Sequence, residues 1–405
     1  MPTQTTRPQT AFLAQQLDEL KAKGTFFRLR ELEDEQDAVC TFDGKRVINL
    51  ASNNYLGFCN HPKLKEAAIE ATRKYGVGPG AVRTIAGTMK LHLELEEKIA
   101  RFKNVEACVV FQSGFTANAG TVSAILGKGD WIISDELNHA SIIDGARLSR
   151  ANIKVFRHKD LEHAEQLLEE IKSEPGRKLI ITDGVFSMDG DIGPLPGLCD
   201  LAERYDAIMM VDDAHSSGVL GRNGRGTIDH FNVHGRVDIQ VGTLSKAIGA
   251  IGGYVCGSRD LIDFLYHRAR PFLFSTGHPP SVTATCMAAF DLLESEPDRI
   301  KCLWENTRYF KRELGTLGFN IGGQNTPASE TPITPIIVGD GRLAMNFSRE
   351  LFNEGVMATG IAFPTVQEGK ARIRTIMTSN HTKAMMDEAL ETLERVGKRL
   401  GILGA

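Results

Sequence analysis

The sequence has no apolar run that approaches the ~18 residues of a membrane-spanning helix, so we do not expect a membrane protein. Its seven cysteines are scattered and include no CxxC pair, which argues against a disulfide framework and against a zinc site. Residues 1–10 are polar and lack the apolar core of a secretory signal. Together these absences predict a cytoplasmic protein with reduced thiols and no metal centre.

An excess of basic charge is also missing. The sequence has 47 Lys and Arg residues against 51 Asp and Glu, a formal charge of −4, so we expect no nucleic-acid or membrane-surface partner. There is no GxxxxGK[ST] loop and no HExxH motif. Gly76-Val-Gly-Pro-Gly80 departs from GxGxxG, and Ser113 lacks the glycines of a GxSxG nucleophile elbow. These absences argue against P-loop enzymes, dinucleotide-dependent oxidoreductases and α/β-hydrolases.

The sequence does contain an alternation of short apolar runs and amphipathic segments between residues 63 and about 260. Short continuous apolar runs are typical of strands buried on both faces of a parallel sheet. We therefore predict an α/β protein with an open, doubly wound, mostly parallel sheet of seven strands. The predicted strands are residues 107–111, 131–134, 153–156, 179–182, 208–211, 237–242 and 253–257, and the predicted helices include 163–173 and 198–205.

The pattern changes after about residue 275. A helical stretch over 281–314, strands at 333–338 and 371–376, and an amphipathic helix at about 382–400 predict a smaller α+β domain. Ahead of the sheet, a helix that stops at Gly24 and a strand at 46–50 predict an N-terminal extension. The predicted division is 1–60 for this extension, 61–280 for the large domain and 281–405 for the small C-terminal domain.

Polar and reactive side chains follow most of the predicted strands, and ligands of open α/β sheets bind beyond the carboxyl ends of the strands. Each side chain alone has an ordinary explanation: His139 as a core histidine, Asp212 as a helix cap, Lys246 as a surface lysine. Their coincidence instead predicts one binding site, to which the strand end at Phe156 offers the weakest candidate. The residues at these ends are Gly114, His139, Asp183, Ser187, Asp212, His215, Thr243, Ser245 and Lys246.

These groups match the chemical needs of pyridoxal 5'-phosphate (PLP). A lysine amine can form a Schiff base with the PLP aldehyde, and an apolar pocket lowers its pKa so that it can react. A carboxylate beside the pyridine nitrogen keeps that nitrogen protonated, which makes the ring an electron sink. Backbone N–H groups at a helix N-terminus bind a phosphate. Lys246, Asp212 and the turn at Gly114 are the candidates for these three tasks.

Four segments carry a resemblance to a known family. Asn138-His-Ala-Ser-Ile-Ile-Asp-Gly145, Asp183-Gly-Val-Phe-Ser-Met-Asp-Gly190, Val211-Asp-Asp-Ala-His215 and Gly242-Thr-Leu-Ser-Lys246 resemble the α-oxoamine synthases. These are fold-type I PLP enzymes that condense an amino acid with an acyl-CoA thioester. The resemblance runs from about residue 20 to the C-terminus. Residues 134–145 and 371–375 are most similar to the glycine C-acetyltransferases, also called 2-amino-3-ketobutyrate CoA ligases; Ser245 departs from members with glycine there.

The resemblance implies a role for each matching residue. Lys246 would carry the cofactor and act as the base at the substrate α-carbon, and Arg374 would bind the amino-acid carboxylate near Asn53. His139 would stack on the ring and face the developing oxyanion. The other implied cofactor contacts are Asp212 at the pyridine nitrogen, His215 at the ring oxygen, Ser187, and, at the phosphate, Gly114, Phe115 and Thr243 with Ser275 and Thr276 of a partner subunit.

The resemblance therefore implies a homodimer with shared active sites that joins glycine to acetyl-CoA, giving 2-amino-3-oxobutyrate and CoA. The alternative within the family is an 8-amino-7-oxononanoate synthase or another synthase that decarboxylates its product. An aminotransferase of the same fold would use Lys246 and Asp212 identically, so the residues alone leave that reaction open.

Overall fold

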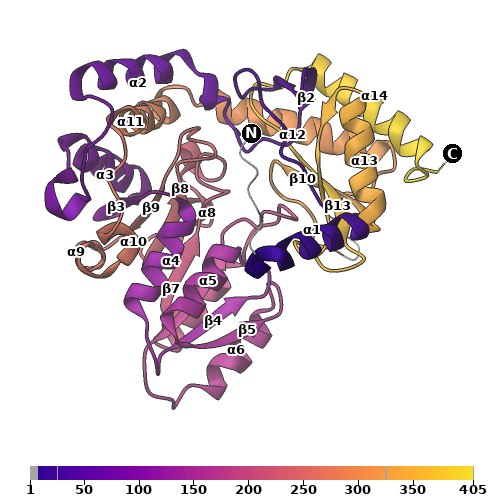
Figure 1. The fold of residues 1–405 in the computed structure, drawn as a ribbon. Coiled ribbons are helices and arrows are strands. Elements are labelled where there is room, and N and C mark those ends of the chain that lie inside the picture. Colours follow the sequence, from indigo (N-terminus) through magenta and orange to yellow (C-terminus); the bar gives the residue numbers. More distant parts are fainter. Residues whose placement is uncertain (1–7, 25, 324–325, 405) are drawn as a thin grey trace.

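The computed structural model describes residues 8–24, 26–323 and 326–404, which form a large α/β unit with a smaller unit beside it (Figure 1). The large unit contains a seven-stranded sheet of order β3-β9-β8-β7-β6-β4-β5. Its strands from β5 to β8 run parallel to one another, whereas β9 is antiparallel to both neighbours. This confirms the predicted sheet. The strands are β3 (Ala107–Phe111), β4 (Trp131–Asp135), β5 (Asn152–Phe156), β6 (Lys178–Asp183), β7 (Ile208–Asp212), β8 (Ile239–Thr243) and β9 (Gly253–Gly257).

Helices cover both faces of this sheet because its strands present apolar side chains on both sides. On one face Val109 and Val241 are buried among helices α4, α5, α9 and α10, and on the other Ile180 and Val211 are buried among α6, α7 and α8. These helices are α4 (Gly114–Ile125), α5 (Ala140–Ser149), α6 (Leu161–Glu170), α7 (Leu195–Arg204), α8 (Thr227–His230), α9 (Arg259–Arg268) and α10 (Arg270–Leu273).

The small unit holds an antiparallel sheet of order β10-β13-β12, against which α13 packs (Figure 1). The N-terminal extension joins this unit, because β2 pairs with β1 on one side and with β11 on the other. We propose that the N-terminal extension and the small unit together form one domain beside the large domain. The elements are β1 (Val39–Phe42), β2 (Lys45–Asn49), β10 (Ile333–Gly339), β11 (Val356–Met357), β12 (Thr359–Ile361), β13 (Ala371–Ile376), α13 (Gly341–Asn353) and α14 (Lys383–Arg399).

The single helical stretch predicted over 281–314 is two helices, α11 (Pro280–Ser295) and α12 (Asp298–Thr316). The break falls at Glu296, which has φ −124° and ψ 59°. Pro297 follows, and a proline disfavours the helical conformation of the residue before it. The break lets the two helices serve different units: α11 packs against α2 (Pro62–Tyr75) and α3 (Lys90–Lys103), and α12 against α14.

Helix α1 (Ala11–Lys23) lies apart from the core. It ends as predicted at Gly24, whose φ of 71° is left-handed and favours glycine. None of its residues is buried, and the apolar side chains of Phe12, Leu13, Leu17 and Leu20 are between 42% and 54% exposed. Short single turns complete the fold: η1 (Pro8–Thr10), η2 (Phe58–Asn60), the π-helical η3 (Arg83–Gly87) and η4 (Arg222–Gly224).

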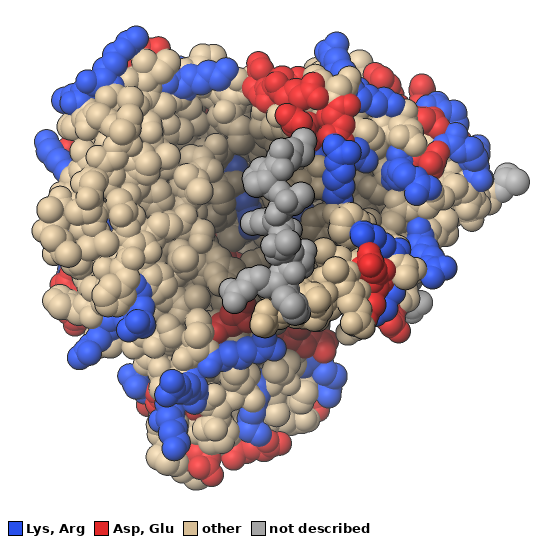
Figure 2. All heavy atoms as spheres, in the orientation of Figure 1, with Lys and Arg blue, Asp and Glu red and all other residues tan. Residues whose placement is uncertain are grey.

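The face shown in Figure 2 is hollowed between the two units, and Lys and Arg residues alternate with Asp and Glu around its outer edge. No helix in the described part of the chain is both long and apolar enough to cross a membrane.

Candidate active site

The carboxyl ends of the parallel strands meet at one edge of the large sheet. Asp183 at the end of β6 lies in register with Asp212 at the end of β7, and Thr243 ends the neighbouring strand β8. The loops after these strands surround a cavity of about 190 Å³. Most of the residues that the sequence predicts for the site therefore share one cavity. Its lining consists of Ser113, Gly114, Phe115, His139, Ser141, Asp183, Ser187, Asp212, Ala214, His215, Thr243, Ser245 and Lys246.

Lys246 reaches the cavity from the turn that follows β8. Backbone hydrogen bonds from Leu244 to Gly252 (2.9 Å) and from Gly249 to Lys246 (3.0 Å) close this turn. Gly249 has a left-handed φ of 77°, which glycine adopts without strain. Burial lowers the pKa of Lys246 to about 8, although the nearby Asp212 carboxylate acts in the opposite direction. At neutral pH this lysine therefore has far more neutral amine than an exposed lysine has.

Asp212 is fixed through both of its carboxylate oxygens. Oδ1 accepts a hydrogen bond from the backbone N–H of Ala214 (2.9 Å), and Oδ2 accepts one from Nδ2 of Asn118 (2.6 Å). The next residue, Asp213, turns the other way and forms a buried ion pair with Lys103 at 2.7 Å. The orientation of the Asp212 carboxylate is thus set before any ligand enters.

His139 caps helix α5 and is held at the cavity by contacts with Ser141 and Asp183. Its Nδ1 is 2.7 Å from Oγ of Ser141, and that hydroxyl also accepts a hydrogen bond from Asn118 (3.0 Å). Asn118 thereby connects His139 to Asp212. The backbone N–H of His139 donates to Oδ2 of Asp183 (2.8 Å). Burial lowers the pKa of His139, which favours the neutral ring at neutral pH.

His215 is a buried residue of the cavity lining and follows the end of β7 by three residues. Its Nδ1 is 2.8 Å from the hydroxyl oxygen of Tyr55. Burial, assisted by the charges of Lys246 and Arg374, holds the pKa of His215 well below its usual value. The ring is therefore neutral, and its Nε2 has no hydrogen-bond partner within the described residues, which leaves it available to a ligand.

Helix α4 begins at the cavity and offers an anion site. Oγ of Ser113 accepts a hydrogen bond from the backbone N–H of Thr116 (3.1 Å), so Ser113 is the N-cap. The backbone N–H groups of Gly114 and Phe115 belong to the first turn, where a helix supplies no acceptor. Oγ1 of Thr243 lies opposite, 2.7 Å from Oγ of Ser245. A phosphate placed here would face N–H donors, hydroxyl groups and the positive end of the helix.

Arg374 and Asn53 lie beside the cavity rather than in its lining. Nε of Arg374, on β13, donates to the backbone oxygen of Ser187 (2.6 Å), and Nη2 contacts Oδ1 of Asn53 (3.4 Å). The small unit thus supplies Arg374, the arginine that the sequence predicts for the substrate carboxylate.

Ser275 and Thr276 do not line the cavity of their own chain. The backbone oxygen of Thr276 accepts a hydrogen bond from Nε2 of Gln112 (2.8 Å), and Thr276 forms an isolated bridge with Val82. Phe274, just before them, is 69% exposed. That the pair serves the phosphate site of another subunit stays a prediction.

The family model described as aminotransferase class I and II matches residues 45–393 of the chain. The chain is also 57% identical over 394 residues to the 8-amino-7-oxononanoate synthase of Symbiobacterium thermophilum, a match that covers 97% of this chain and 99% of the relative. The chain belongs to the α-oxoamine synthases, within the class I and II aminotransferase family. The resemblance of its motifs to this family is thereby confirmed.

Two further comparisons place this α-oxoamine synthase more closely. It is 55% identical over 392 residues to 8-amino-7-oxononanoate synthase 1 of Bacillus subtilis (strain 168), covering 97% of this chain and 98% of the relative. A serine palmitoyltransferase variant from S. paucimobilis, solved with a bound PLP–myriocin aldimine, superposes with a TM-score of 0.91 at 29% identity, covering 98% of this chain and 99% of that one. Fold type I and PLP as the cofactor are confirmed.

The predicted similarity to the glycine C-acetyltransferases is wrong, and so is the condensation of glycine with acetyl-CoA that it implied. Relatives with more than half of their residues identical over nearly the whole chain are named 8-amino-7-oxononanoate synthases. The two short segments behind the prediction, 134–145 and 371–375, contain His139 and Arg374, which lie in the cavity lining and beside it. A match confined to two short segments does not determine which acyl group and which amino acid the chain joins.

The cavity of this α-oxoamine synthase fits PLP on its own geometry. It combines a lysine of lowered pKa, a fixed carboxylate, two neutral imidazoles and a helix N-terminus within one lining. The sequence did not reveal Asn118 or Tyr55, which orient the predicted residues. Asn118 could have been noticed as the one amide side chain of α4, whose other polar residues are two threonines and a serine. Tyr55 gave no such signal.

Proposed function

We propose that this α-oxoamine synthase forms 8-amino-7-oxononanoate. The observation that supports this is its 57% and 55% identity, over 97% of the chain, to enzymes of that name from S. thermophilum and B. subtilis. The structure of the product defines the substrates. Its carbons 1 to 7 are a heptanedioic (pimelic) acyl group, and carbons 8 and 9 with the amine are alanine without its carboxylate. The balanced reaction is alanine plus a pimeloyl thioester, giving product, CO2 and the free thiol.

The residues at the cavity have suitable places for this reaction. PLP, when bound, withdraws electrons from the amino-acid α-carbon. Nζ of Lys246, with its pKa near 8, accepts the α-proton and can later return one. Nη1 of Arg374 has no partner within the described residues and can take the alanine carboxylate. His139 offers a neutral ring in the cavity lining to hydrogen-bond the thioester oxygen as the new carbon–carbon bond forms.

Substrate choice gives the direct test of this function. We expect alanine and a pimeloyl thioester to yield one CO2 and one free thiol for each 8-amino-7-oxononanoate, measured by mass spectrometry and thiol titration. Glycine with the same thioester, and alanine with acetyl-CoA, serve as matched controls and should react at least about tenfold more slowly, because each removes methyl or methylene groups that a pocket can bury. Faster turnover of either control pair, or amino transfer to a 2-oxo acid without thiol release, would contradict the proposal.

We propose that the working unit is a homodimer in which Ser275 and Thr276 of each chain reach the phosphate site of the other. Contacts of Thr276 with Gln112 and Val82 bring together exposed apolar side chains next to the cavity. Exposed apolar side chains gathered in one place are typical of interfaces. This patch consists of Ile85 (82% exposed), Phe115 (45%) and Phe274 (69%), each within three residues of one of these contacts.

A charge placed in this patch should separate the subunits. We expect Phe274→Asp to shift the protein from dimer to monomer in sedimentation velocity runs at micromolar concentration, because a carboxylate would be buried without a partner. Leu148→Asp is the control: Leu148 is 64% exposed on α5, away from the patch, and should leave the dimer intact. A monomeric native protein, or an unchanged dimer in Phe274→Asp, would speak against this interface.

A further inference from the structure

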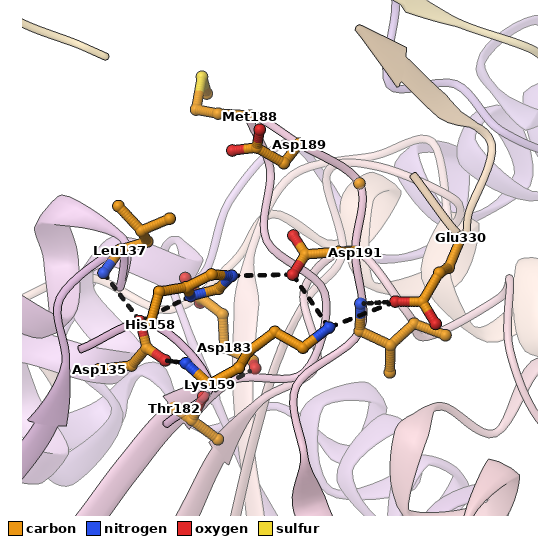
Figure 3. Close-up of polar contacts among 12 residues, drawn as sticks. Asp135, Leu137, His158, Lys159, Thr182, Asp183, Met188, Asp189, Asp191 and Glu330 are labelled. Atoms are coloured by element: carbon orange, nitrogen blue, oxygen red, sulfur yellow. Dashed lines mark hydrogen bonds and ion pairs between the residues drawn. The ribbon is translucent and has the colours of Figure 1, made fainter. Parts of the chain in front are cut away.

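His158 occupies the strand end at which the sequence offers the weakest candidate for the site. It follows β5 and joins two carboxylates, one at the end of β4 and one in the loop after β6 (Figure 3). Its Nδ1 is 3.0 Å from Oδ1 of Asp135, and its Nε2 is 2.8 Å from Oδ2 of Asp191. The ring is 11% exposed, and neither carboxylate side chain is exposed at all. The functional site described above uses none of these three residues.

Through Asp135, this bridge is connected to the turn that positions His139. Oδ1 of Asp135 also accepts a hydrogen bond from the backbone N–H of Leu137 (2.9 Å), and Oδ2 accepts one from that of Lys159 (2.9 Å). Asp135 therefore fixes the turn that starts at the end of β4 and delivers His139 to the cavity four residues later.

Through Asp191, the bridge is connected to the loop that contains Ser187. Backbone hydrogen bonds from Phe186 to Asp191 (3.0 Å) and from Gly190 to Phe186 (2.8 Å) make residues 186–191 one tight loop, with Ser187 inside it. The Phe186 ring packs edge-on against the His158 ring, with 4.4 Å between ring centroids. The far side of the same loop is held by Arg374 at the backbone oxygen of Ser187.

The bridge requires a charged ring. Both carboxylates accept hydrogen bonds, so both ring nitrogens must donate, and only the imidazolium has two N–H groups. These two hydrogen bonds raise the pKa of His158 to about 9 in spite of its burial. Other charged groups also face the bridge: Lys159 lies 3.2 Å from Asp191, Glu330 pairs with Lys159 at 3.4 Å, and Glu136 accepts the backbone N–H of His158.

We propose that His158 is a positioning residue whose protonated ring ties the His139 loop to the Ser187 loop and thereby sets the width of the PLP cavity. The proposal rests on the proposed cofactor contacts of His139 and Ser187, but not on which acyl group or amino acid reacts. The loss of either hydrogen bond would let one wall of the cavity move independently of the other.

The affinity for PLP tests this role separately from product formation. The holoenzyme is dialysed against graded PLP concentrations, and bound cofactor is read from its absorbance. We expect His158→Gln to weaken PLP binding about tenfold at pH 7, because one buried carboxylate is left without its donor. His234→Gln is the matched control, since His234 also bonds a buried carboxylate, that of Asp229 at 3.1 Å, but neither residue lines the cavity. It should bind PLP as the native protein does.

The pH dependence distinguishes positioning from a general loss of packing. The ratio of the two dissociation constants, variant over native, should stay near tenfold up to about pH 8 and fall toward one by about pH 10, as the native ring loses its charge. Because Lys246 titrates in both proteins, its effect on PLP affinity cancels in this ratio. Asp191→Asn, which keeps the side-chain volume, should give the same pattern if His158→Gln does not fold. A ratio within twofold of one at pH 7, or one that stays high to pH 10, would overturn the proposal.

Discussion

Lys246→Ala is expected to lower turnover by about 10⁴-fold or more while the protein keeps its fold and still binds PLP without a covalent link. Lys246 is the only lysine among the described residues of the cavity lining. Its loss removes both the amine that attaches the cofactor and the base for the α-proton. The phosphate and ring contacts come from other residues, so binding should persist.

Borohydride treatment followed by denaturation measures the covalent link, because reduction fixes only cofactor that is joined to an amine. We expect the native protein to retain PLP and Lys246→Ala to release it. Lys311→Ala provides the control. Burial also lowers the pKa of Lys311 to about 8, but its Nζ bonds Ser329 in the small unit, so the cofactor should stay fixed. Multiple turnovers by Lys246→Ala without an added amine would show that another base does this work.

The sequence predicts the large sheet well because the signal is local. Each buried strand is a short run of apolar residues, and the groups at its carboxyl end follow directly in the chain. Lys246, Asp212 and His139 could therefore be assigned to one cavity before their distances were known. The helix break at Glu296 was also open to prediction, because Pro297 is visible, but the long helical pattern on both sides concealed it.

The residues that orient the site could not be predicted in this way, because their partners are far away in the chain. Asn118 is 94 residues from Asp212, and Tyr55 is 160 residues from His215. His158 lies close to the end of β5, yet its function depends on Asp191, 33 residues further on. A histidine on its own resembles many structural histidines. The acyl substrate was predicted wrongly for a related reason: pocket walls, and not the shared catalytic motifs, determine which thioester fits.

Asp212→Asn should lower the rate of α-hydrogen loss from alanine by about 10²–10³-fold, because a neutral amide cannot keep the pyridine nitrogen protonated. The fold should survive the change. The new amide would keep its acceptor toward Ala214, and its NH2 group would meet Asn118. Oδ1 of Asn118 is buried and has no partner among the residues that the structure describes, so a flip of that side chain would supply the acceptor.

Asp213→Asn separates the electronic role of Asp212 from a role in folding, since the two neighbours differ in their contacts. Asp213 pairs with the buried Lys103 and accepts hydrogen bonds from Ser216 and Thr227, so its neutralisation leaves a buried cation unpaired. We expect Asp213→Asn to reduce the free energy of unfolding by about 3–5 kcal/mol and Asp212→Asn to leave it almost unchanged. We follow exchange of the alanine α-hydrogen into D2O by NMR. This rate should fall much further in Asp212→Asn than in Asp213→Asn. Native exchange in Asp212→Asn would mean that another group protonates the ring.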